Sequence, residues 1–510
     1  METHNIEQRL QQFEQQQREA LGLEQQPIHW YDTSVTASQP FDKTKHTVLF
    51  GGLTEAHDQL LLATLKGRGY RAQALPTPNL TALQQGKEFG NRGQCNPTYF
   101  TVGNLLYTLQ QLRDQEGLSS EQIVRDYAFV TASTCGPCRF GMYVTEYRKA
   151  LRDAGFEGFR VMSFQTESSV ENEPLAFTLD KRLSLALLRA LVIADVINAL
   201  GYRMRPYEVN QGETDQAQSD AIALVSAAIQ QRNGLNKGLK CARQCLHSVE
   251  LDLLQAKPKV SIIGEFWAMT TEGEGNYRLQ RFLESEGAEC EVQPISAWFL
   301  YLIWAARASH AEATRAGQHS RWRGGLQQGK LRLAQRTLKS YFQHIAKQLG
   351  LDYYKLTDMD ELASVSERYY STQLRGGEGH MEVGKLIQSF RDNKHHLVLS
   401  VKPFGCMPSS GVSDGIQPLV VTEYPDANFL AVETSGDGAV NVYSRVQMAL
   451  FRARKSAEAE YQAMLKKYHI DDLQLRQKIA SKRYFPHQVA GTAANGVIAV
   501  AAQPITRDLP

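Results

Sequence analysis

The sequence predicts an α/β protein with two parallel-sheet domains, a helical segment between them and helical ends. Three observations support this class. Short apolar runs of strand-forming residues alternate with helical periodicity in two parts of the chain, 45–180 and 257–450. Between them, residues 181–256 show helical periodicity and no clear strand. Strands that alternate with helices are typical of parallel sheets joined by right-handed crossovers.

Composition narrows the class of protein further. The 510 residues suffice for two or three domains with full cores, and 42% hydrophobic residues are ordinary for a globular chain. A net charge of +2 predicts no strong attraction to nucleic acid or anionic membranes. The start of the chain has no apolar signal-peptide core, and the most apolar helix, 183–200, carries Arg189 and Asp195, which favours burial in protein. Seven cysteines without regular spacing suggest no disulfide framework, so we expect reduced thiols in the cytoplasm.

Local signals define each element of the first domain. Residues 1–44 begin with a Gln- and Glu-rich stretch that predicts a solvated helix. Glycines 67 and 69 end the first helix of the domain, and a glycine-rich loop precedes Cys95 and the next helix. A further helix is expected over Val144–Leu151. The expected strands are Thr47–Phe50, Arg71–Leu75, Tyr127–Val130 and Phe159–Phe164.

The second domain is expected to begin at Lys257. The apolar, aromatic residues 298–306 predict a helix that faces either the core or a partner. Residues 308–345 are basic and helical, and with so small a net charge we interpret them as a solvated face. Residues 451–510 combine a charged helix with a tail to which no structure is assigned. The expected strands are Lys259–Ile263, Cys290–Val292, His396–Val401 and Asn428–Glu433.

Cysteines stand at strand ends and helix starts in three separate places. Cys135 and Cys138 follow a buried strand, Cys406 follows another, and Cys95 comes just before a helix. Ligands of α/β sheets bind at the carboxyl ends of strands, and helix starts favour thiolate over thiol. If these places share one cleft, four thiolates converge. A sulfur-rich site without a matching histidine pattern favours an iron–sulfur cluster or Zn²⁺.

Three other interpretations stay open for these cysteines. A lone cysteine is often a small buried hydrophobe, and this is the interpretation we favour for Cys241 and Cys245. Cys135-Gly-Pro-Cys138 matches the thioredoxin tetrapeptide, which would make the chain a thiol–disulfide oxidoreductase, although Thr134 replaces the usual aromatic residue. A four-cysteine site could also hold structural Zn²⁺ and dock partner proteins.

Five glycine-containing segments, three of which also contain cysteine, occur in order between residues 45 and 450: 86–103, Cys135–Tyr143, Gly264–Trp267, Gly376–His380 and Lys402–Ser410. By these segments the chain resembles the 2-hydroxyacyl-CoA dehydratase and benzoyl-CoA reductase superfamily. Within it, the chain is most similar to the iron–sulfur proteins related to the activases of those dehydratases.

The resemblance implies two flavodoxin-like (Rossmann-like) domains with a [4Fe–4S] cluster between them. It implies that Cys95, Cys135 and Cys406 are ligands, with Cys138 as a fourth ligand or a close neighbour. Related activase-fused proteins have a second cysteine soon after the first, where this chain has Thr98. Relatives with a double cubane use six cysteines, so we expect a single cubane here.

The resemblance also implies an activity and partners. We expect a dehydratase- or reductase-like iron–sulfur component of anaerobic metabolism. It would accept low-potential electrons from an ATP-hydrolysing activase for reduction or radical dehydration of an acyl-CoA-type substrate. A second copy or a related subunit is a further expected partner, and nucleic acid and membranes are not. No Gly-x-x-x-x-Gly-Lys-Ser/Thr motif occurs, so this chain alone is not expected to bind or hydrolyse ATP.

Three glycine-rich loops with acidic residues are further candidates for the functional site. The loops 271–276, 376–380 and 434–438 carry Glu274, Glu378 and His380 among their polar residues. We expect all three loops to face the cleft of Cys406, with these side chains serving in proton transfer or substrate orientation.

Overall fold

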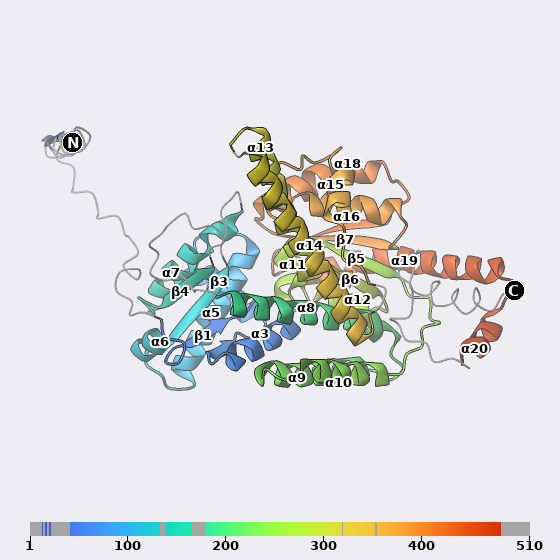
Figure 1. The fold of residues 1–510 in the computed structure, drawn as a ribbon, viewed down its shortest axis with the longest axis horizontal. Helices are drawn as coiled ribbons and strands as arrows, with labels where there is room; N and C mark the ends of the chain where they lie inside the picture. The colour runs from blue at the N-terminus through green and yellow to red at the C-terminus, as the bar shows by residue number, and fades with distance from the viewer. Residues whose placement is uncertain are drawn as a thin grey trace.

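Two four-stranded, all-parallel sheets form the framework, which confirms the predicted α/β fold (Figure 1). The structure is a computed structural model that describes residues 13, 16, 17, 20, 21, 41–132, 138–164, 180–318, 320–351 and 354–480. The first sheet has the order β2-β1-β3-β4 and the second the order β6-β5-β7-β8. The strands of the first sheet are β1 (Thr47–Phe50), β2 (Arg71–Ala74), β3 (Tyr127–Ala132) and β4 (Arg160–Phe164). Those of the second sheet are β5 (Lys259–Gly264), β6 (Glu289–Val292), β7 (Leu397–Pro403) and β8 (Phe429–Thr434).

Both sheets share one topology. Within each, the first and third strands of the domain are neighbours, the second lies outside the first and the fourth outside the third, as in flavodoxin-like folds. All eight expected strands are present, and their ends differ from the expected ones by no more than two residues. The crevice between the first and third strands is where such sheets bind ligands at their carboxyl ends. The topology therefore provides two potential ligand-binding crevices in one chain, one at each sheet.

Helices cover both faces of each sheet because strand residues point alternately to opposite sides. In the first sheet Leu49 and Phe129 belong to one core, and Val48 and Ala128 belong to another. The helices of this domain are α3 (Glu55–Gly67), α4 (Leu80–Phe89), α5 (Asn96–Asp114), α6 (Ser120–Asp126) and α7 (Tyr143–Asp153). The second domain contains α11 (Phe266–Thr270), α12 (Leu279–Ser285), α15 (Met359–Ser366), α16 (His380–Arg391), α17 (Met407–Ser409), α18 (Gln417–Thr422), α19 (Ala439–Lys467) and α20 (Asp472–Ala480).

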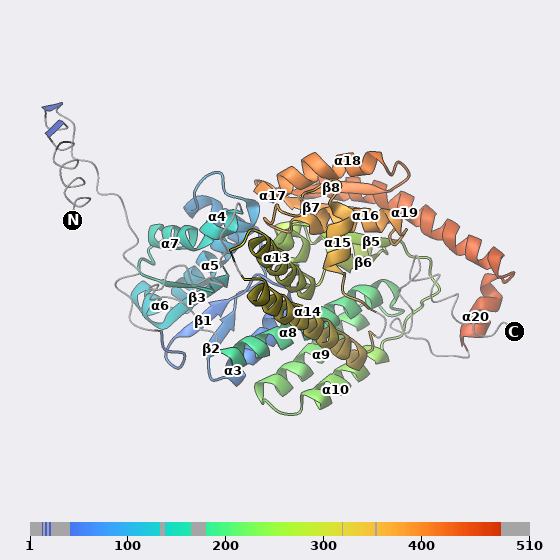
Figure 2. The same cartoon turned by 45° about the horizontal axis from the view of Figure 1, so that its top comes forward.

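A layer of long helices joins the two sheets (Figures 1 and 2). It contains α8 (Lys181–Met204), α9 (Glu213–Gln230), α10 (Leu235–Ser248), α13 (Ile295–Arg315) and α14 (Arg321–Leu349), which share one apolar core with α3. By length and composition alone, Lys181–Tyr207 is one described helix apolar enough to cross a membrane, and 56% of its most apolar window is buried in the protein. Helix α8 is thus the central helix of this layer.

Asp195 of α8 provides the missing cap of α13. Helix α13 begins after Pro294, whose side chain cannot accept a hydrogen bond. The buried Asp195 carboxyl accepts from the backbone N–H groups of Ile295 at 2.8 Å and Ser296 at 2.7 Å. It also accepts from the Ser296 hydroxyl at 2.5 Å and lies 3.2 Å from His57 Nε2. One buried side chain therefore ties the helical layer to both domains.

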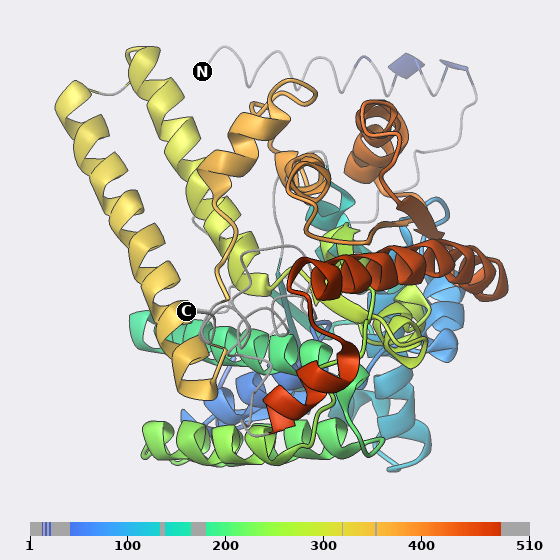
Figure 3. The same ribbon diagram turned by 90° about the vertical axis from the view of Figure 1, so that its right-hand side faces the viewer.

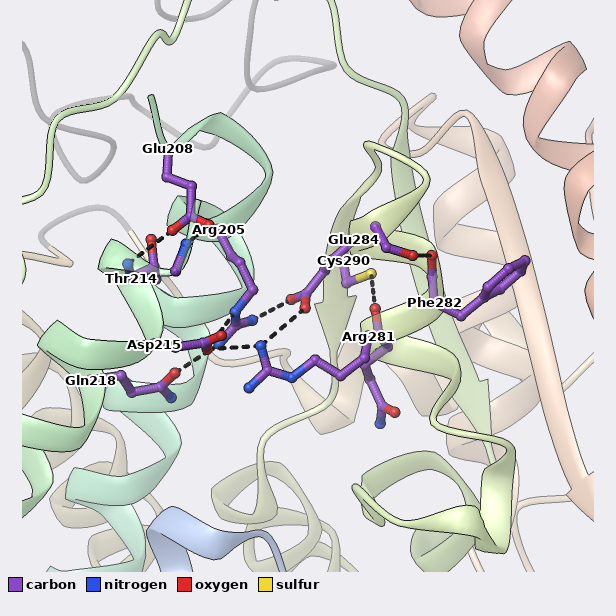
Figure 4. A network of polar contacts seen from close by, with 12 residues as sticks. Arg205, Glu208, Thr214, Asp215, Gln218, Arg281, Phe282, Glu284 and Cys290 are labelled. Atoms are coloured by element: carbon purple, nitrogen blue, oxygen red, sulfur yellow. Dashed lines mark hydrogen bonds and ion pairs between the residues drawn. The ribbon is translucent and has the colours of Figure 1, made fainter. Parts of the chain in front are cut away.

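A charged network ties the helical layer to the second domain (Figure 4). Arg205, at the end of α8, donates to Asp215 at 2.9 Å, to Glu284 at 2.6 Å and to Gln218 at 2.8 Å. Arg281 of α12 donates to the same Asp215 oxygen at 2.8 Å. Neighbouring Glu284 and Asp215 raise the pKa of Arg205 although its burial acts the other way. The network holds α8 and α9 against α12.

Candidate functional site

Three of the four candidate cysteines lie where the carboxyl ends of the two sheets meet. Cys138 follows the third strand of the first domain and Cys406 follows the third strand of the second, so the two occupy matching positions in the two domains. Cys95 stands at the start of α5. Cys135 lies outside the described residues. Convergence of loops from both domains, and not one local motif, therefore builds this site.

Cys95 is buried at the N-terminus of α5. Its Sγ lies 3.1 Å from Thr98 Oγ1 and 3.2 Å from Tyr143 OH. Thr98, three residues after Cys95, thus contacts the thiol through its hydroxyl. Asn96 and Pro97 open the helix, and proline at this position loses no helical hydrogen bond. The thiol is thus held in place by a fixed backbone and two hydroxyl groups.

The loop of Cys406 is in direct contact with the loop of Cys95. The backbone N–H of Asn96 donates to the carbonyl of Phe404 at 3.0 Å, which joins the two domains next to both cysteines. Gly405 has φ +78°, and a Cβ there would lie 3.2 Å from Cys95 Cα and 3.5 Å from Arg139 Nη1. Cys406 Sγ donates to Ser409 Oγ at 3.3 Å. Figure 2 shows α17, which starts after Cys406, at the junction with the first domain.

Cys138 begins the short 3-10 helix η1 (Arg139–Met142). Its Sγ accepts from the backbone N–H of Phe140 at 3.5 Å. Burial first, and then the charges of Glu265, Glu378 and Cys95, raise the pKa of the Cys138 thiol to about 11. The expectation that a helix start makes this cysteine a thiolate is wrong, because one peptide N–H offsets little of the loss of water.

Three glutamates complete the site, of which Glu378 and Glu382 are buried and Glu265 is half-buried. Glu265 follows β5, and its carboxylate accepts from Ala268 N–H at 2.8 Å. Glu378 accepts from Phe266 N–H at 2.8 Å. Glu382, one turn further along α16, accepts from Ser409 Oγ at 3.4 Å, and its second oxygen has no partner among the described residues. Ser409 thus links this carboxyl to Cys406.

Burial makes these groups weak acids. It raises the pKa of Glu265, of Glu378 and of Glu382, the last to about 8. The charge of Glu265 adds to the increase for Glu378 and Glu382, and that of Glu382 adds to the increase for Glu378. Burial first, then Glu265 and Glu378, raise the pKa of Cys406. The largest charge effects on these groups come from neighbouring carboxyls, and they act in the same direction as burial. A positively charged group bound among these thiols and carboxyls would stabilise their ionised forms. It would therefore lower the pKa values that burial raises.

The donor set suits a thiophilic metal. Soft thiolates bind iron–sulfur clusters and Zn²⁺, and their binding releases the thiol protons. Among the described residues, no three His, Cys, Asp or Glu side chains are close enough to hold a metal ion as they stand. The described residues leave out Cys135, the candidate ligand next to Cys138 in sequence. The unpartnered Glu382 oxygen and the uncompensated acids fit a cationic group at this place.

We expect Cys138 in the metal-free protein to react slowly with iodoacetamide. With a pKa of about 11, its thiolate fraction at pH 8 is about one hundredfold below that of an ordinary thiol, and its rate should rise about tenfold for each pH unit up to that pKa. Mass spectrometry of the peptide that contains Cys138 measures the rate, with the same cysteine in urea-unfolded protein as the control. Equal rates at pH 8 in the folded and unfolded protein would instead favour the thiol–disulfide oxidoreductase.

Glu274 joins the second domain to the start of α4. Its carboxylate accepts from Leu80 N–H at 2.6 Å, and Glu272 accepts from Glu55 N–H at 2.7 Å. These two acids of one loop therefore cap α4 and α3 of the first domain. In the third glycine-rich loop, Gly436 packs against Leu83 of α4. Both loops face the first domain, but no contact with a cysteine is recorded for either among the described residues.

The capping role of Glu274 leads to a stability prediction. Glu274→Ala should lower the free energy of unfolding by about 1 kcal/mol, because the first N–H groups of α4 lose an acceptor. Glu274→Gln should retain most of the stability, since an amide oxygen can accept the same bond. Urea unfolding followed by circular dichroism measures both. An alanine variant as stable as the parent would show that Glu274 does not hold the domains together.

His380 packs among aromatic rings. Its ring meets Trp304 edge-on at 4.3 Å and Tyr301 at 5.5 Å between centroids. Burial lowers its pKa to about 4, and Nε2 has no partner among the described residues. The structure therefore brings Glu378 to the cysteines, whereas the recorded contacts of His380 are with α13.

Three functional candidates were missed from the sequence. Glu265 directly follows a predicted strand, and its place at a strand end was the available signal. Glu382 lies in the first turn of the helix that follows the glycine-rich loop 376–380, and its place next to that candidate loop was the signal. No sequence feature could have identified Tyr143, because only the packing of the folded chain brings its hydroxyl to Cys95.

The chain was also compared with known proteins. No protein-family model and no curated protein sequence matches it.

Proposed function

We propose that the chain is an iron–sulfur protein whose cluster lies at the junction of the two sheets, held by Cys95, Cys406 and the Cys135/Cys138 segment. The observation that carries this proposal is the backbone hydrogen bond between Asn96 and Phe404, which brings two cysteine loops from different domains together. When bound, such a cluster supplies one-electron transfer and, with only three thiolate ligands, a Lewis-acidic iron.

The surrounding residues would position and protonate a substrate. Glu378 and Glu382 are buried beside the cysteines, and burial raises the pKa of both carboxyls, that of Glu382 to about 8. The free oxygen of Glu382 can donate or accept a hydrogen bond into the site. Reduction or dehydration of an acyl-CoA-type substrate needs a proton moved as well as an electron. We therefore assign proton delivery to Glu378 and Glu382, whereas Glu274 holds the start of α4 and His380 packs against α13.

A separate ATP-hydrolysing activase would supply the electrons. This division of labour rests on the resemblance and on the absence of a phosphate-binding Gly-Lys-Ser/Thr loop from the sequence. The purified chain should then show no ATPase activity, and its cluster should be reduced only by the activase or by a strong chemical reductant. Tight ATP binding by the isolated chain would contradict this assignment.

Anaerobic purification followed by metal, sulfide and absorption measurements tests the function. Iron with acid-labile sulfide and broad visible absorption is the expected result. A colourless protein with one bound zinc per chain would show that the same thiols form a structural zinc site. A metal-free protein with a disulfide between Cys135 and Cys138 would support the oxidoreductase instead.

A further inference from the structure

Helices α13 and α14 form an antiparallel hairpin whose tip stands clear of both sheets (Figures 1 and 3). The two helices are closely packed near this tip. A Cβ on Gly324 would lie only 2.4 Å from Thr314 Oγ1, so a glycine is needed for the approach. The hairpin therefore presents the outer face of α14 on a firm support.

The outer face of α14 is apolar along one line. Leu338, Phe342 and other buried residues face the protein, whereas Trp322, Leu326 and Leu333 are 78%, 51% and 66% exposed. At about 100° per residue, the three exposed residues lie within about 40° of one another and roughly opposite the buried face. Scattered exposed leucines are ordinary, but an aligned Trp-Leu-Leu stripe is not.

Basic residues flank this stripe on both sides. Helix α14 has seven Lys or Arg residues and no Asp or Glu. Arg323 and Lys330 lie on one side of the stripe, and Arg332 and Arg336 on the other. All four are exposed, and no ion pair is recorded for them in the described part of the chain. The one acid of α13, Glu312, is already paired with Arg375.

An apolar stripe flanked by basic residues fits one class of partner better than the others. A second copy of the hairpin would bring equal positive charges together and be repelled. A nucleic acid would match the charges but would leave Leu326 and Leu333 against water or phosphate. An anionic bilayer matches both, because tryptophan and leucine enter its interface while Lys and Arg contact the headgroups.

We infer that α14 docks the protein on an anionic phospholipid surface, with the helix lying in the plane of the interface. The absence of a membrane partner was expected from the net charge of +2, but the fold concentrates positive charge on one projecting helix. Charge attraction to anionic lipid falls off within a Debye length, so this local concentration counts for more than the total.

Vesicle co-sedimentation of the full chain tests the inference. The chain should bind vesicles of phosphatidylcholine mixed with phosphatidylserine, should not bind phosphatidylcholine alone, and should bind less at high salt. Arg332→Gln with Arg336→Gln should weaken binding about 30-fold, the product of about fivefold for each charge. Trp322→Ser with Leu333→Ser should abolish both binding and the vesicle-induced shift in tryptophan fluorescence.

A matched control removes two charges elsewhere. Arg452→Gln with Lys466→Gln changes two exposed basic residues of α19, with the same loss of net charge, and should leave vesicle binding unchanged. The inference fails if the parent chain does not bind mixed vesicles, or if the control variant loses as much binding as the hairpin variant. It also fails if the chain prefers duplex DNA and Trp322→Ser with Leu333→Ser leaves that binding intact, or if the same changes dissolve a dimer.

Discussion

Cys406→Ser is expected to remove most of the iron from the anaerobically purified protein while the chain stays folded. Cys406 is buried where its loop meets the loop of Cys95, so a serine fits the space but offers a poor ligand for iron. Loss of a residue that only supports a ligand typically weakens metal binding about 10- to 100-fold, so loss of a ligand should exceed that. Iron and sulfide analysis, with circular dichroism for folding, measures the effect.

The position of the cysteine provides the control for this experiment. Cys95→Ser and Cys135→Ser should act like Cys406→Ser, because the proposal places all three around one cluster. Cys241 lies on α10 in the helical layer, so Cys241→Ser should leave the iron content unchanged. Full iron content in the Cys406→Ser variant would disprove a shared site between the domains.

Asp195→Ala should cause the largest loss of stability, about 3–5 kcal/mol in the free energy of unfolding. The change removes the acceptor of two backbone N–H groups and one hydroxyl at the start of α13, and leaves them unpartnered in a buried place. Losses of this size are typical when one partner of a buried charged network is removed. Urea unfolding followed by tryptophan fluorescence measures the change.

Two further variants serve as controls for the effect of Asp195→Ala on stability. Asp195→Asn keeps one oxygen for the helix start and should lose less stability than Asp195→Ala. Asp426 is exposed, and Asp426→Ala should change stability by less than about 0.5 kcal/mol. If Asp195→Ala were as stable as Asp426→Ala, the capping of α13 by α8 would not hold the layer together.

The site and the stability of the domain junction rest on neighbouring contacts. Glu272 and Glu274 cap two helices of the first domain from a loop of the second, and the Asn96–Phe404 bond lies beside the cysteines. Movement between the domains would therefore alter the distance between Cys95 and Cys406.

The sequence by itself determined the alternation of strands and helices and the place of each cysteine along the chain. Short apolar runs and glycine punctuation are local signals, so all eight strands could be found without knowledge of their neighbours. The positions of Cys138 and Cys406 after the third strands follow from the same pattern. The family resemblance added an expected cofactor to these places.

Only the tertiary structure decided which side chains meet. Glu382 and Tyr143 reach the cysteines because α16 and α7 pack there, and Glu274 and His380 have other partners for the same reason. Desolvation depends on what covers a group, so the high pKa of Cys138 could not follow from its place at a helix start. Contacts between residues far apart in the chain leave no periodic signal in the sequence.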